Sequence, residues 1–144
     1  MDTVRAIIAR KGKTVFSVAS GATVLDAARI MGDNGLGAVL VIDEERLVGI
    51  FTERDTLRRV VAAQKDPVGT LVGEVMTSSL YTCVPATTVD ECGAIMTTHR
   101  IRHLPVVDEE GLHGLVSIGD LLAYRVREQE DTIRYLNQYM FNAR

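Results

Sequence analysis

Hydrophobic and polar positions follow the same pattern twice along this chain. Residues 23–57 align with residues 88–122 at a shift of 65 without a gap, and twelve of the 35 aligned positions are identical. Unrelated sequences of this composition would share about two or three. A repeat of this length in only two copies is not a solenoid array. It indicates a duplicated module whose two halves complete one another.

Each copy predicts the element order β-α-β-β-α. A short alternating segment leads through a turn to a Thr with capping-box spacing to an acidic residue, Thr23 with Asp26 and Thr88 with Glu91. After this Thr, the helical spacing of apolar residues predicts a helix. Two short apolar runs then predict two strands, and a second helix follows them at the end of each copy. The expected bounds are 15–18, 24–34, 38–42 and 47–51 in the first copy, and 80–83, 89–100, 103–107 and 112–116 in the second.

The fold class that follows is mixed α/β (α+β). Each copy alone leaves a small sheet with an uncovered face, so we expect the two motifs to pack through their sheets with pseudo-twofold symmetry. Helices are also expected at 4–10, at 72–77 and from Leu121 to the C-terminus. The apolar stripe of that last helix fits either a docking or dimer surface or packing on its own module. The expected domains are 1–65 with the N-terminal helix, a linker at 66–78, 79–127, and a helical tail at 128–144.

Composition narrows the class of protein. The chain has 144 residues, 47% of them hydrophobic and 24% charged, which is typical of a globular domain. A net charge of −3 argues against a nucleic-acid surface. We expect a cytoplasmic protein with no membrane contact, since there is no apolar run of about 18 residues and no signal-peptide core. Cys83 and Cys92 are expected to be reduced and packed as small hydrophobic residues.

The candidate chemistry lies where the last strand of each copy meets its second helix. Both copies read glycine, two apolar residues, Thr or Ser, two residues, Asp: Gly49 to Asp55 and Gly114 to Asp120. One interpretation is structural, because a Thr or Ser followed three residues later by Asp caps a helix. The other is functional, because helix N-termini bind phosphate and a carboxylate accepts ribose hydroxyls. The occurrence of the pattern in both copies favours the functional interpretation.

These motifs resemble those of tandem cystathionine-beta-synthase (CBS) domains, the arrangement called a Bateman module. The resemblance covers about residues 4–127. It rests on the two Gly-x-x-Thr/Ser-x-x-Asp motifs and on three further stretches. These stretches are Thr23-Val24-Leu25-Asp26-Ala27, Val75-Met76-Thr77 and His103-Leu104-Pro105-Val106-Val107. The resemblance is strongest to small stand-alone members, and it implies adenosyl ligands such as AMP, ATP, NAD or S-adenosylmethionine bound between the two domains.

Carried onto this sequence, the resemblance implies roles for individual residues. Asp55 and Asp120 would hold ribose hydroxyls, and Thr52 and Ser117 would place ribose or phosphate. Segments around 13–15, 36–38, 79–81 and 101–103 would hold adenine, while Arg54 would pair with phosphate. The expected nucleotide-binding residues are Lys13, Thr14, Val15, Gly37, Ala38, Thr52, Arg54, Asp55, Ser79, Tyr81, Arg100, Arg102, His103, Pro105, Ser117 and Asp120.

The two copies also differ, and the differences predict unequal sites. Arg54 corresponds to Gly119, and the glycines of 35–37 correspond to the arginines of 100–102, which phosphates in a central cleft would recruit. His99 and His103 lack further ligands at metal-binding spacing, so we expect no metal. No nucleophile–base pair is visible, and we expect no catalysis and no required cofactor. The predicted function is an adenine-nucleotide-binding regulatory and energy-sensing module that acts on a client protein as a homodimer formed through its CBS modules. The alternative is a ligand-free interaction scaffold.

Overall fold

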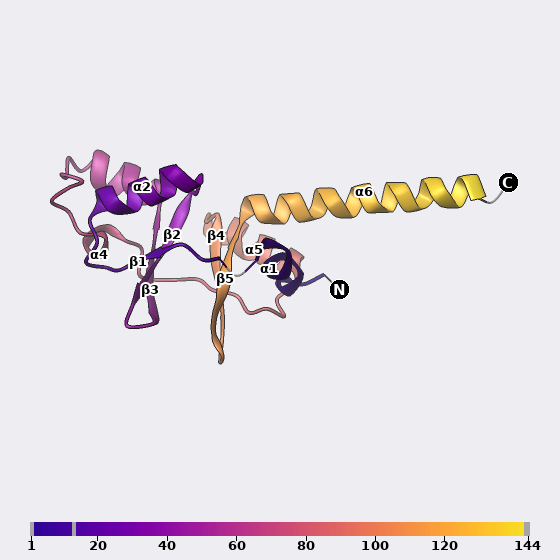
Figure 1. Ribbon diagram of the computed structural model, residues 1–144, viewed down its shortest axis with the longest axis horizontal. Helices are drawn as coiled ribbons and strands as arrows, with labels where there is room; N and C mark the ends of the chain where they lie inside the picture. The colour runs from indigo at the N-terminus through magenta and orange to yellow at the C-terminus, as the bar shows by residue number, and fades with distance from the viewer. Residues whose placement is uncertain (1, 13, 143–144) are drawn as a thin grey trace. The chain divides into compact units, whose positions relative to one another are not determined.

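The computed structural model describes residues 2–12 and 14–142, which fall into two compact units. The first-repeat unit comprises 14–82, and the second-repeat unit comprises 2–12 together with 83–142. Each combines helices with a small sheet (Figure 1), so the expected mixed α/β class is confirmed. Among the described residues, no helix is both long and apolar enough to cross a membrane.

The first-repeat unit contains a three-stranded sheet in the order β1-β2-β3. Its elements are β1 (Ser17–Val18), α2 (Val24–Asn34), β2 (Ala38–Asp43), β3 (Arg46–Thr52), α3 (Glu53–Asp55), the π-helical segment η1 (Thr56–Val61) and α4 (Val72–Val75). β1 is parallel to β2, and β2 is antiparallel to β3. The core forms where α2, η1 and α4 cover one face of the sheet, and Phe51 and Val39 are fully buried in it.

The second-repeat unit contains a two-stranded antiparallel sheet, β4 with β5. Its elements are α1 (Val4–Lys11), α5 (Val89–His99), β4 (His103–Asp108), β5 (Gly111–Ser117) and α6 (Ile118–Asn142). The core joins residues of α1, α5, both strands and the start of α6. The helix α6 is continuous across residue 127, so the tail that we separated at 128 continues a helix of the unit.

The strand expected at 80–83 is not formed, and that prediction was wrong. Cys83 makes only a single parallel bridge to Val106. In the first-repeat unit the Leu40 N–H donates to the Phe16 carbonyl at 3.2 Å as β1 joins the sheet. The repeat-equivalent of Leu40 is Pro105, which has no N–H, so the corresponding ladder hydrogen bond cannot form. One proline therefore reduces the third strand of this sheet to a bridge.

The helices predicted from apolar spacing and capping residues are confirmed. α2 has the expected bounds, and α5 ends one residue earlier than expected, before Arg100 in the left-handed conformation (φ +53°). The Thr23 hydroxyl accepts the Asp26 N–H at 3.1 Å, and the Thr88 hydroxyl accepts the Glu91 N–H at 3.0 Å. These caps satisfy N–H groups that the first turn of a helix leaves without partners.

The helix that precedes each repeat packs on the other repeat. At the 65-residue shift α1 corresponds to the chain around α4. α4 lies against β3 and η1 of the first repeat, whereas α1 lies against β5 and α6 of the second. We expected the N-terminal helix to belong with residues 14–65, but Val4 and Ile7 are buried in the core of the second-repeat unit. The two leading helices are thus exchanged between the repeats.

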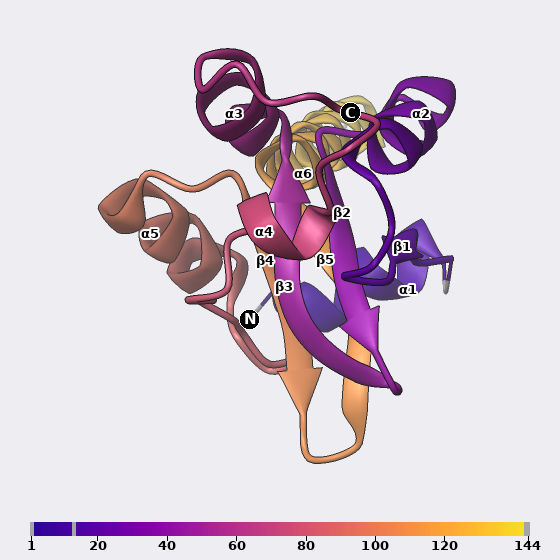
Figure 2. The same cartoon turned by 90° about the vertical axis from the view of Figure 1, so that its left-hand side faces the viewer.

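The glycine that opens each motif makes room for these exchanged segments. A Cβ atom on Gly49 would lie 2.5 Å from the Met76 Sδ and 3.0 Å from the Thr77 carbonyl oxygen. A Cβ on Gly114, the equivalent position, would lie 2.8 Å from the Ile8 Cδ1. Such separations are shorter than van der Waals contact, so only glycine fits without movement of the neighbour. Figure 2 shows α4 crossing β3 in the first-repeat unit.

Cys83 and Cys92 are free thiols in the core of the second-repeat unit. A hydrogen bond with Cys92, together with burial, raises the pKa of Cys83. The thiol of Cys83 therefore remains protonated near neutral pH and packs as a small apolar group, as we expected.

Candidate functional site

The first motif closes a capping box at the junction of β3 and α3. The Thr52 hydroxyl accepts the Asp55 N–H at 3.1 Å, and the Asp55 Oδ2 accepts the Thr52 N–H at 3.1 Å. The structural interpretation of the motif is therefore confirmed in this unit. The same geometry fixes the rotamer of the carboxylate, which is a precondition for the functional interpretation.

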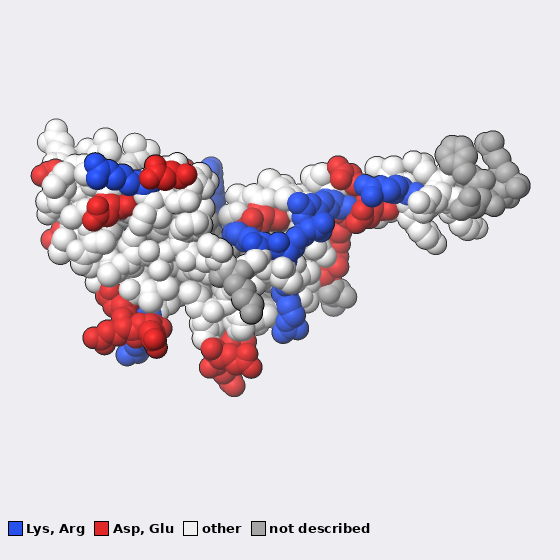
Figure 3. Space-filling view, in the orientation of Figure 1, with Lys and Arg blue, Asp and Glu red and all other residues white. Residues whose placement is uncertain are grey.

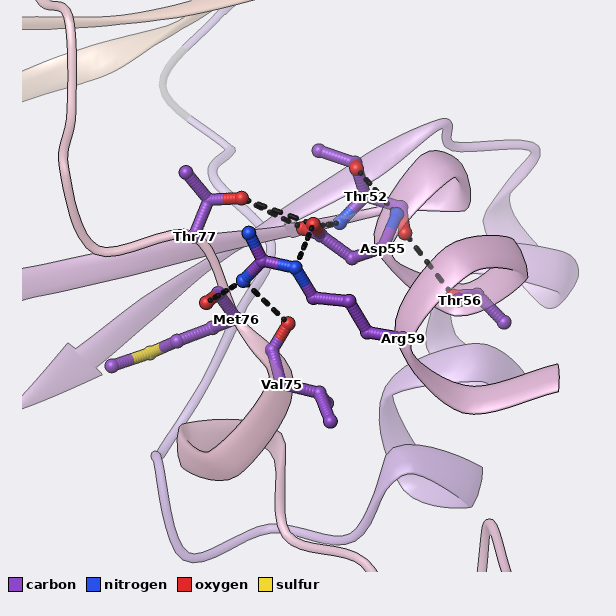
Figure 4. A network of polar contacts seen from close by, with 7 residues as sticks. All are labelled: Thr52, Asp55, Thr56, Arg59, Val75, Met76 and Thr77. Carbon is purple, nitrogen blue, oxygen red and sulfur yellow. Dashed lines mark hydrogen bonds and ion pairs between the residues drawn. The ribbon is translucent and has the colours of Figure 1, made fainter. Parts of the chain in front are cut away.

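Asp55 is the centre of a buried polar network (Figure 4), with only 6% of its surface exposed. The Thr77 hydroxyl donates to its two carboxylate oxygens, at 3.0 and 3.2 Å, and the Arg59 Nε lies 3.7 Å from Oδ1. Arg59 also donates to the Met76 carbonyl at 2.8 Å, at the end of α4. A buried charge needs such partners to offset its lost hydration. The network ties the motif to the segment that leads into the second repeat.

The second motif forms the same box with a different partner. The Asp120 Oδ2 accepts the Ser117 N–H at 2.8 Å, and the Ser117 hydroxyl accepts the Asp120 N–H at 3.1 Å. Here the additional donor is the Lys11 ammonium, 2.7 Å from the same Oδ2 and 2.7 Å from the Leu115 carbonyl. The Asp120 side chain is 24% exposed against 8% for Asp55, so this carboxylate is the more accessible one.

The two carboxylates take these partners from equivalent stretches of chain. The 65-residue shift places Met76 and Thr77 over Lys11 and Gly12. Each carboxylate is therefore held from the C-terminal end of the exchanged leading helix: Lys11 is the last residue of α1, and Thr77 lies two residues after the end of α4. The equivalence extends to position but not to charge, because one partner is a neutral hydroxyl and the other a cation.

The structure brings several expected site residues to these junctions. In the first-repeat unit Ala38 pairs with Thr52 across β2 and β3, and the Gly37 carbonyl accepts the Glu53 N–H at 3.0 Å. Arg54 lies exposed on α3 beside Asp55. The motif that contains Asp55 thus lies beside the start of β2, the neighbouring strand of its own sheet.

The second-repeat unit repeats this arrangement with basic residues. His103 pairs with Ser117 across β4 and β5, and the Arg102 carbonyl accepts the Ile118 N–H at 2.8 Å. Arg100 follows the last residue of α5 as its C-cap, in the left-handed conformation, and is exposed. Gly37 and Ala38 of the first copy are replaced here by Arg102 and His103. The charge difference inferred from the sequence therefore lies at the motif itself.

The remaining expected residues lie away from the two motifs in sequence. Thr14 and Val15 precede β1, and Ser79 and Tyr81 lie between α4 and Cys83. Pro105 is buried in the middle of β4, where its carbonyl accepts the Cys83 N–H at 3.0 Å. Lys13 lies outside the described residues. Contact of these residues with a base stays a prediction.

A basic hollow adjoins Asp120 in the second-repeat unit. It has a volume of about 170 Å³ and lies between α1 and α6. Its lining residues are Ile7, Arg10, Lys11, Asp120, Ala123, Tyr124 and Arg127. Figure 3 shows Lys and Arg side chains gathered over this part of the unit. Three cations against one carboxylate make this hollow attractive to an anion.

Tyr124, which also lines this hollow, makes a hydrogen bond with Asp2 through its hydroxyl. Burial, followed by its hydrogen bond with Asp2, raises the pKa of Tyr124 to about 12. The phenol therefore stays protonated near neutral pH. Sequence reasoning missed Arg10, Lys11, Tyr124 and Arg127. The proximity of Arg10 and Lys11 to Asp120 depends on the exchange of the leading helices, whereas Tyr124 and Arg127 follow Asp120 on one face of α6 and could have been found from helical spacing.

A second polar cluster lies at the far end of the hairpin formed by β4 and β5. Among the described residues, Asp108, Glu110 and His113 have potential ligand atoms within 4.8 Å of one another. The His113 Nε2 lies 2.7 Å from the Asp108 Oδ1, and this hydrogen bond lowers the pKa of Asp108. The Glu110 N–H also donates to Asp108, at 2.8 Å. These contacts account for the cluster as the closure of a turn.

Comparison with known proteins supports the assignment of the two repeats. The model of the CBS domain family matches residues 4–62 and 72–127. The CBS domain-containing protein CBSX3, mitochondrial, from Arabidopsis thaliana is 38% identical over 123 residues, covering 82% of this chain and 60% of that protein. The chain therefore spans about three fifths of the length of this relative.

Two solved structures extend the comparison to the fold. A protein with CBS domains from Burkholderia ambifaria MC40-6 is similar with a TM-score of 0.84 and 42% identity, covering 88% of this chain and 96% of that one. The CBS domain pair of the protein MJ0100 was solved in complex with 5′-methylthioadenosine and S-adenosyl-L-methionine. It is similar with a TM-score of 0.74 and 26% identity, covering 85% of this chain and 98% of that one. With a family match to each of its two repeats and these structural neighbours, this chain belongs to the CBS domain family and carries a tandem pair of the domains.

Proposed function

We propose that this CBS pair binds an adenosyl nucleotide and acts as a regulatory module without catalysis of its own. The observation that carries the proposal is the pair of repeat-equivalent carboxylates, Asp55 and Asp120, each oriented by a capping box at a strand–helix junction. A carboxylate held in this way accepts the two hydroxyls of a ribose. CBS pairs are regulatory modules, and the complex of MJ0100 with two adenosyl compounds supports this ligand class.

In this proposal Thr52 and Ser117 position ribose or phosphate beside the two carboxylates. Arg54, Arg100, Arg102 and His103 bind phosphate oxygens. The base is held by backbone and apolar groups from the expected adenine-contact set: Lys13, Thr14, Val15, Gly37, Ala38, Ser79, Tyr81 and Pro105. The ligand is AMP, ATP, NAD or a related adenosyl compound, and no cofactor is required.

The two sockets differ in what a ribose must displace. At Asp55 the ribose hydroxyls replace the Thr77 hydroxyl, so one hydroxyl that donates to the carboxylate substitutes for another. At Asp120 they replace the Lys11 ammonium, and a displaced cation needs a new anion. A phosphate group of the ligand, bound in the basic hollow beside Asp120, would be that anion. We therefore assign phosphate-bearing ligands to the second socket and a wider range of adenosyl ligands to the first.

Calorimetric titration of the whole chain with AMP, ATP, NAD and S-adenosylmethionine tests the proposal. We expect saturable binding of at least one of these ligands, with a matching rise in melting temperature, because a ligand that binds only the folded state stabilises it. Guanosine and cytidine nucleotides serve as controls for the base. Absence of binding by every adenosyl ligand refutes the proposal and favours the ligand-free scaffold.

A substitution of Lys11 tests the difference between the sockets. Lys11→Met keeps an apolar stem of similar length and removes the charge. We expect binding of AMP at the Asp120 site to weaken by about tenfold, because one charge-assisted hydrogen bond is lost. Adenosine, which has no phosphate, should bind there at least as well as before, since Asp120 is released. Calorimetry with both ligands measures the ratio of AMP affinity to adenosine affinity.

Lys65→Met is the matched control, since Lys65 is exposed and lies in the other unit, outside both motifs. It should leave the ratio of AMP to adenosine affinity unchanged. An equal loss of AMP and adenosine binding in Lys11→Met would show that Lys11 supports the fold of the site and does not contact phosphate.

Regulation in this proposal requires a client protein that responds to the liganded pair. A ligand shifts a conformational equilibrium only by its difference in affinity for the two states. We place the module in the cytoplasm as a homodimer formed through its CBS modules, with neither nucleic acid nor a membrane as partner. Comparison of hydrogen exchange with and without ligand, in the presence and absence of a candidate client, measures the coupling.

A further inference from the structure

The helix α6 has two apolar faces, of which its own unit covers one. On the inner face Leu121 is buried in the core of the second-repeat unit and Tyr124 packs against that core. On the outer face Leu122, Val126 and Ile133 are 61%, 52% and 58% exposed. The remainder of α6 extends beyond the other elements of this unit (Figure 1). Packing of α6 on its own unit therefore does not explain why its outer face is apolar.

The exposed residues of this face follow a heptad spacing. Their positions are Leu122, Val126, Gln129, Ile133, Leu136 and Met140, separated alternately by four and three residues. In heptad notation Val126, Ile133 and Met140 occupy position a, and Leu122, Gln129 and Leu136 occupy position d. Leu136 and Met140 are 49% and 67% exposed, so the apolar residues of this pattern remain exposed to solvent as far as the last turn of α6. This spacing is that of a seam between two helices.

We propose that α6 pairs with α6 of a second copy of this chain in a parallel two-stranded coiled coil over residues 122–140. The residue types favour two strands, because in parallel coiled coils β-branched residues at a with Leu at d select dimers over trimers and tetramers. Val126 and Ile133 are the β-branched residues, and Gln129 interrupts the apolar seam at a single position. A polar residue at one core position of a seam fixes its register at some cost in stability.

Charge complementarity supports the parallel orientation. Arg125 occupies position g, and Glu130 occupies position e of the following heptad. In a parallel pair a residue at g of one helix faces the residue at e five positions later in its partner. Arg125 and Glu130 of the two copies would therefore form two opposite-charge pairs. Arg125 also contacts Asp90 of its own unit, and its five N–H donors can serve both carboxylates.

The low stability of an isolated helix in water also favours pairing of the C-terminal part of α6 with a partner. Helices shorter than about 12–15 residues are marginal in water without tertiary contacts. Residues 128–142 lie beyond the part of the chain that matches the CBS family, and the large apolar residues 133, 135, 136, 139 and 140 are all exposed there. A second copy covers the a and d residues of both helices at once, since a twofold contact buries the same face of each.

Disulfide trapping of the whole chain tests the pairing and its orientation. Leu136→Cys places a thiol at a d position, where the side chains of two parallel helices meet. Gln138→Cys is the matched control, because position f points away from the seam. Cys83 and Cys92 are buried, so the introduced thiol is the reactive one. Under mild oxidation of ligand-free protein we expect Leu136→Cys to form a covalent dimer at least tenfold faster than Gln138→Cys.

Equal rates of cross-linking for the two variants would overturn the proposal. A mixture of Leu122→Cys and Met140→Cys proteins distinguishes orientation, since cross-links between unlike chains faster than those between like chains would require an antiparallel pair and refute the parallel one. The double variant Ile133→Glu/Leu136→Glu should lose helical circular dichroism at 222 nm, because the unpaired tail unwinds. Arg134→Glu/Gln138→Glu, on the other face, should retain it; equal loss would count against the seam.

Discussion

Replacement of Gly49 by alanine should lower the free energy of unfolding by about 1–3 kcal/mol, as expected for overpacking at a tight contact. The new Cβ would meet the Met76 Sδ and the Thr77 carbonyl oxygen, and the latter belongs to the backbone. To relieve this contact the Thr77 segment must move, although its N–H and carbonyl both pair with Ile50 at 2.9 Å. Urea denaturation followed by circular dichroism measures the loss.

Gly32→Ala is the matched control for this prediction. Gly32 lies within α2, and no atom apart from its chain neighbours and the nearby backbone of its own helix lies within 4 Å of the Cβ position. The same chemical change should there raise stability by about 0.5–1 kcal/mol, because alanine is the better helix former. If Gly49→Ala were as stable as Gly32→Ala, the close crossing of α4 over β3 would be incorrect.

The position equivalent to Gly49 should also lose stability, for a different reason. A Cβ on Gly114 would lie 2.8 Å from the Ile8 Cδ1, the end of a flexible side chain that can change rotamer. Gly114 also has a φ of +159°, a backbone conformation that residues with a Cβ rarely adopt. Gly114→Ala should therefore lower the free energy of unfolding in the same denaturation experiment through backbone strain, even if Ile8 moves.

Asp55→Asn and Asp120→Asn should each weaken adenosyl binding at their own site by about 10- to 100-fold. A charge-assisted hydrogen bond contributes about 1.5–3 kcal/mol, and each 1.4 kcal/mol corresponds to a factor of ten. Asparagine keeps the shape of the side chain and one acceptor oxygen for the capping box, so the fold should persist. Calorimetry should show loss of one site in each single variant and loss of both in the double variant.

Asp26→Asn provides the control for capping. Asp26 follows Thr23 at the same spacing, and the Thr23 hydroxyl accepts its N–H in the same way, but it lies at the start of α2. Its substitution should change neither the number of sites nor their affinity. Adenosyl binding that survives in the Asp55→Asn/Asp120→Asn protein would exclude both carboxylates from ribose recognition.

Local signals in the sequence predicted most of the secondary structure. The bounds of α2 and the caps at Thr23 and Thr88 followed from residue types three to four positions apart, and the structure confirms them. The strand expected at 80–83 failed for a reason that was visible in the sequence. Alternation alone favoured a strand there, whereas Pro105 on the neighbouring strand lacks the N–H needed to pair with it.

The candidate site was only partly predictable, because its partners are distant in sequence. The repeat identified Asp55 and Asp120 directly. Lys11 lies 109 residues from Asp120, and no local pattern relates the two. Their contact depends on the exchange of the leading helices, which is a property of packing between distant segments. The 65-residue shift shows that the segment around Lys11 corresponds to the segment around Thr77. It does not show which of the two units each segment packs against.

The exchange of leading helices also sets an order on the assembly of the chain during synthesis. Residues 14–82 form a continuous unit, so they can fold as soon as they leave the ribosome. α1 emerges before them but belongs with β4, β5 and α6, which follow about 100 residues later. At about 5–20 residues per second, α1 must wait roughly 5–20 s for the surface that buries Val4 and Ile7. Circular permutation that joins the present termini and opens the chain near residue 13 would make both units continuous and abolish this delay.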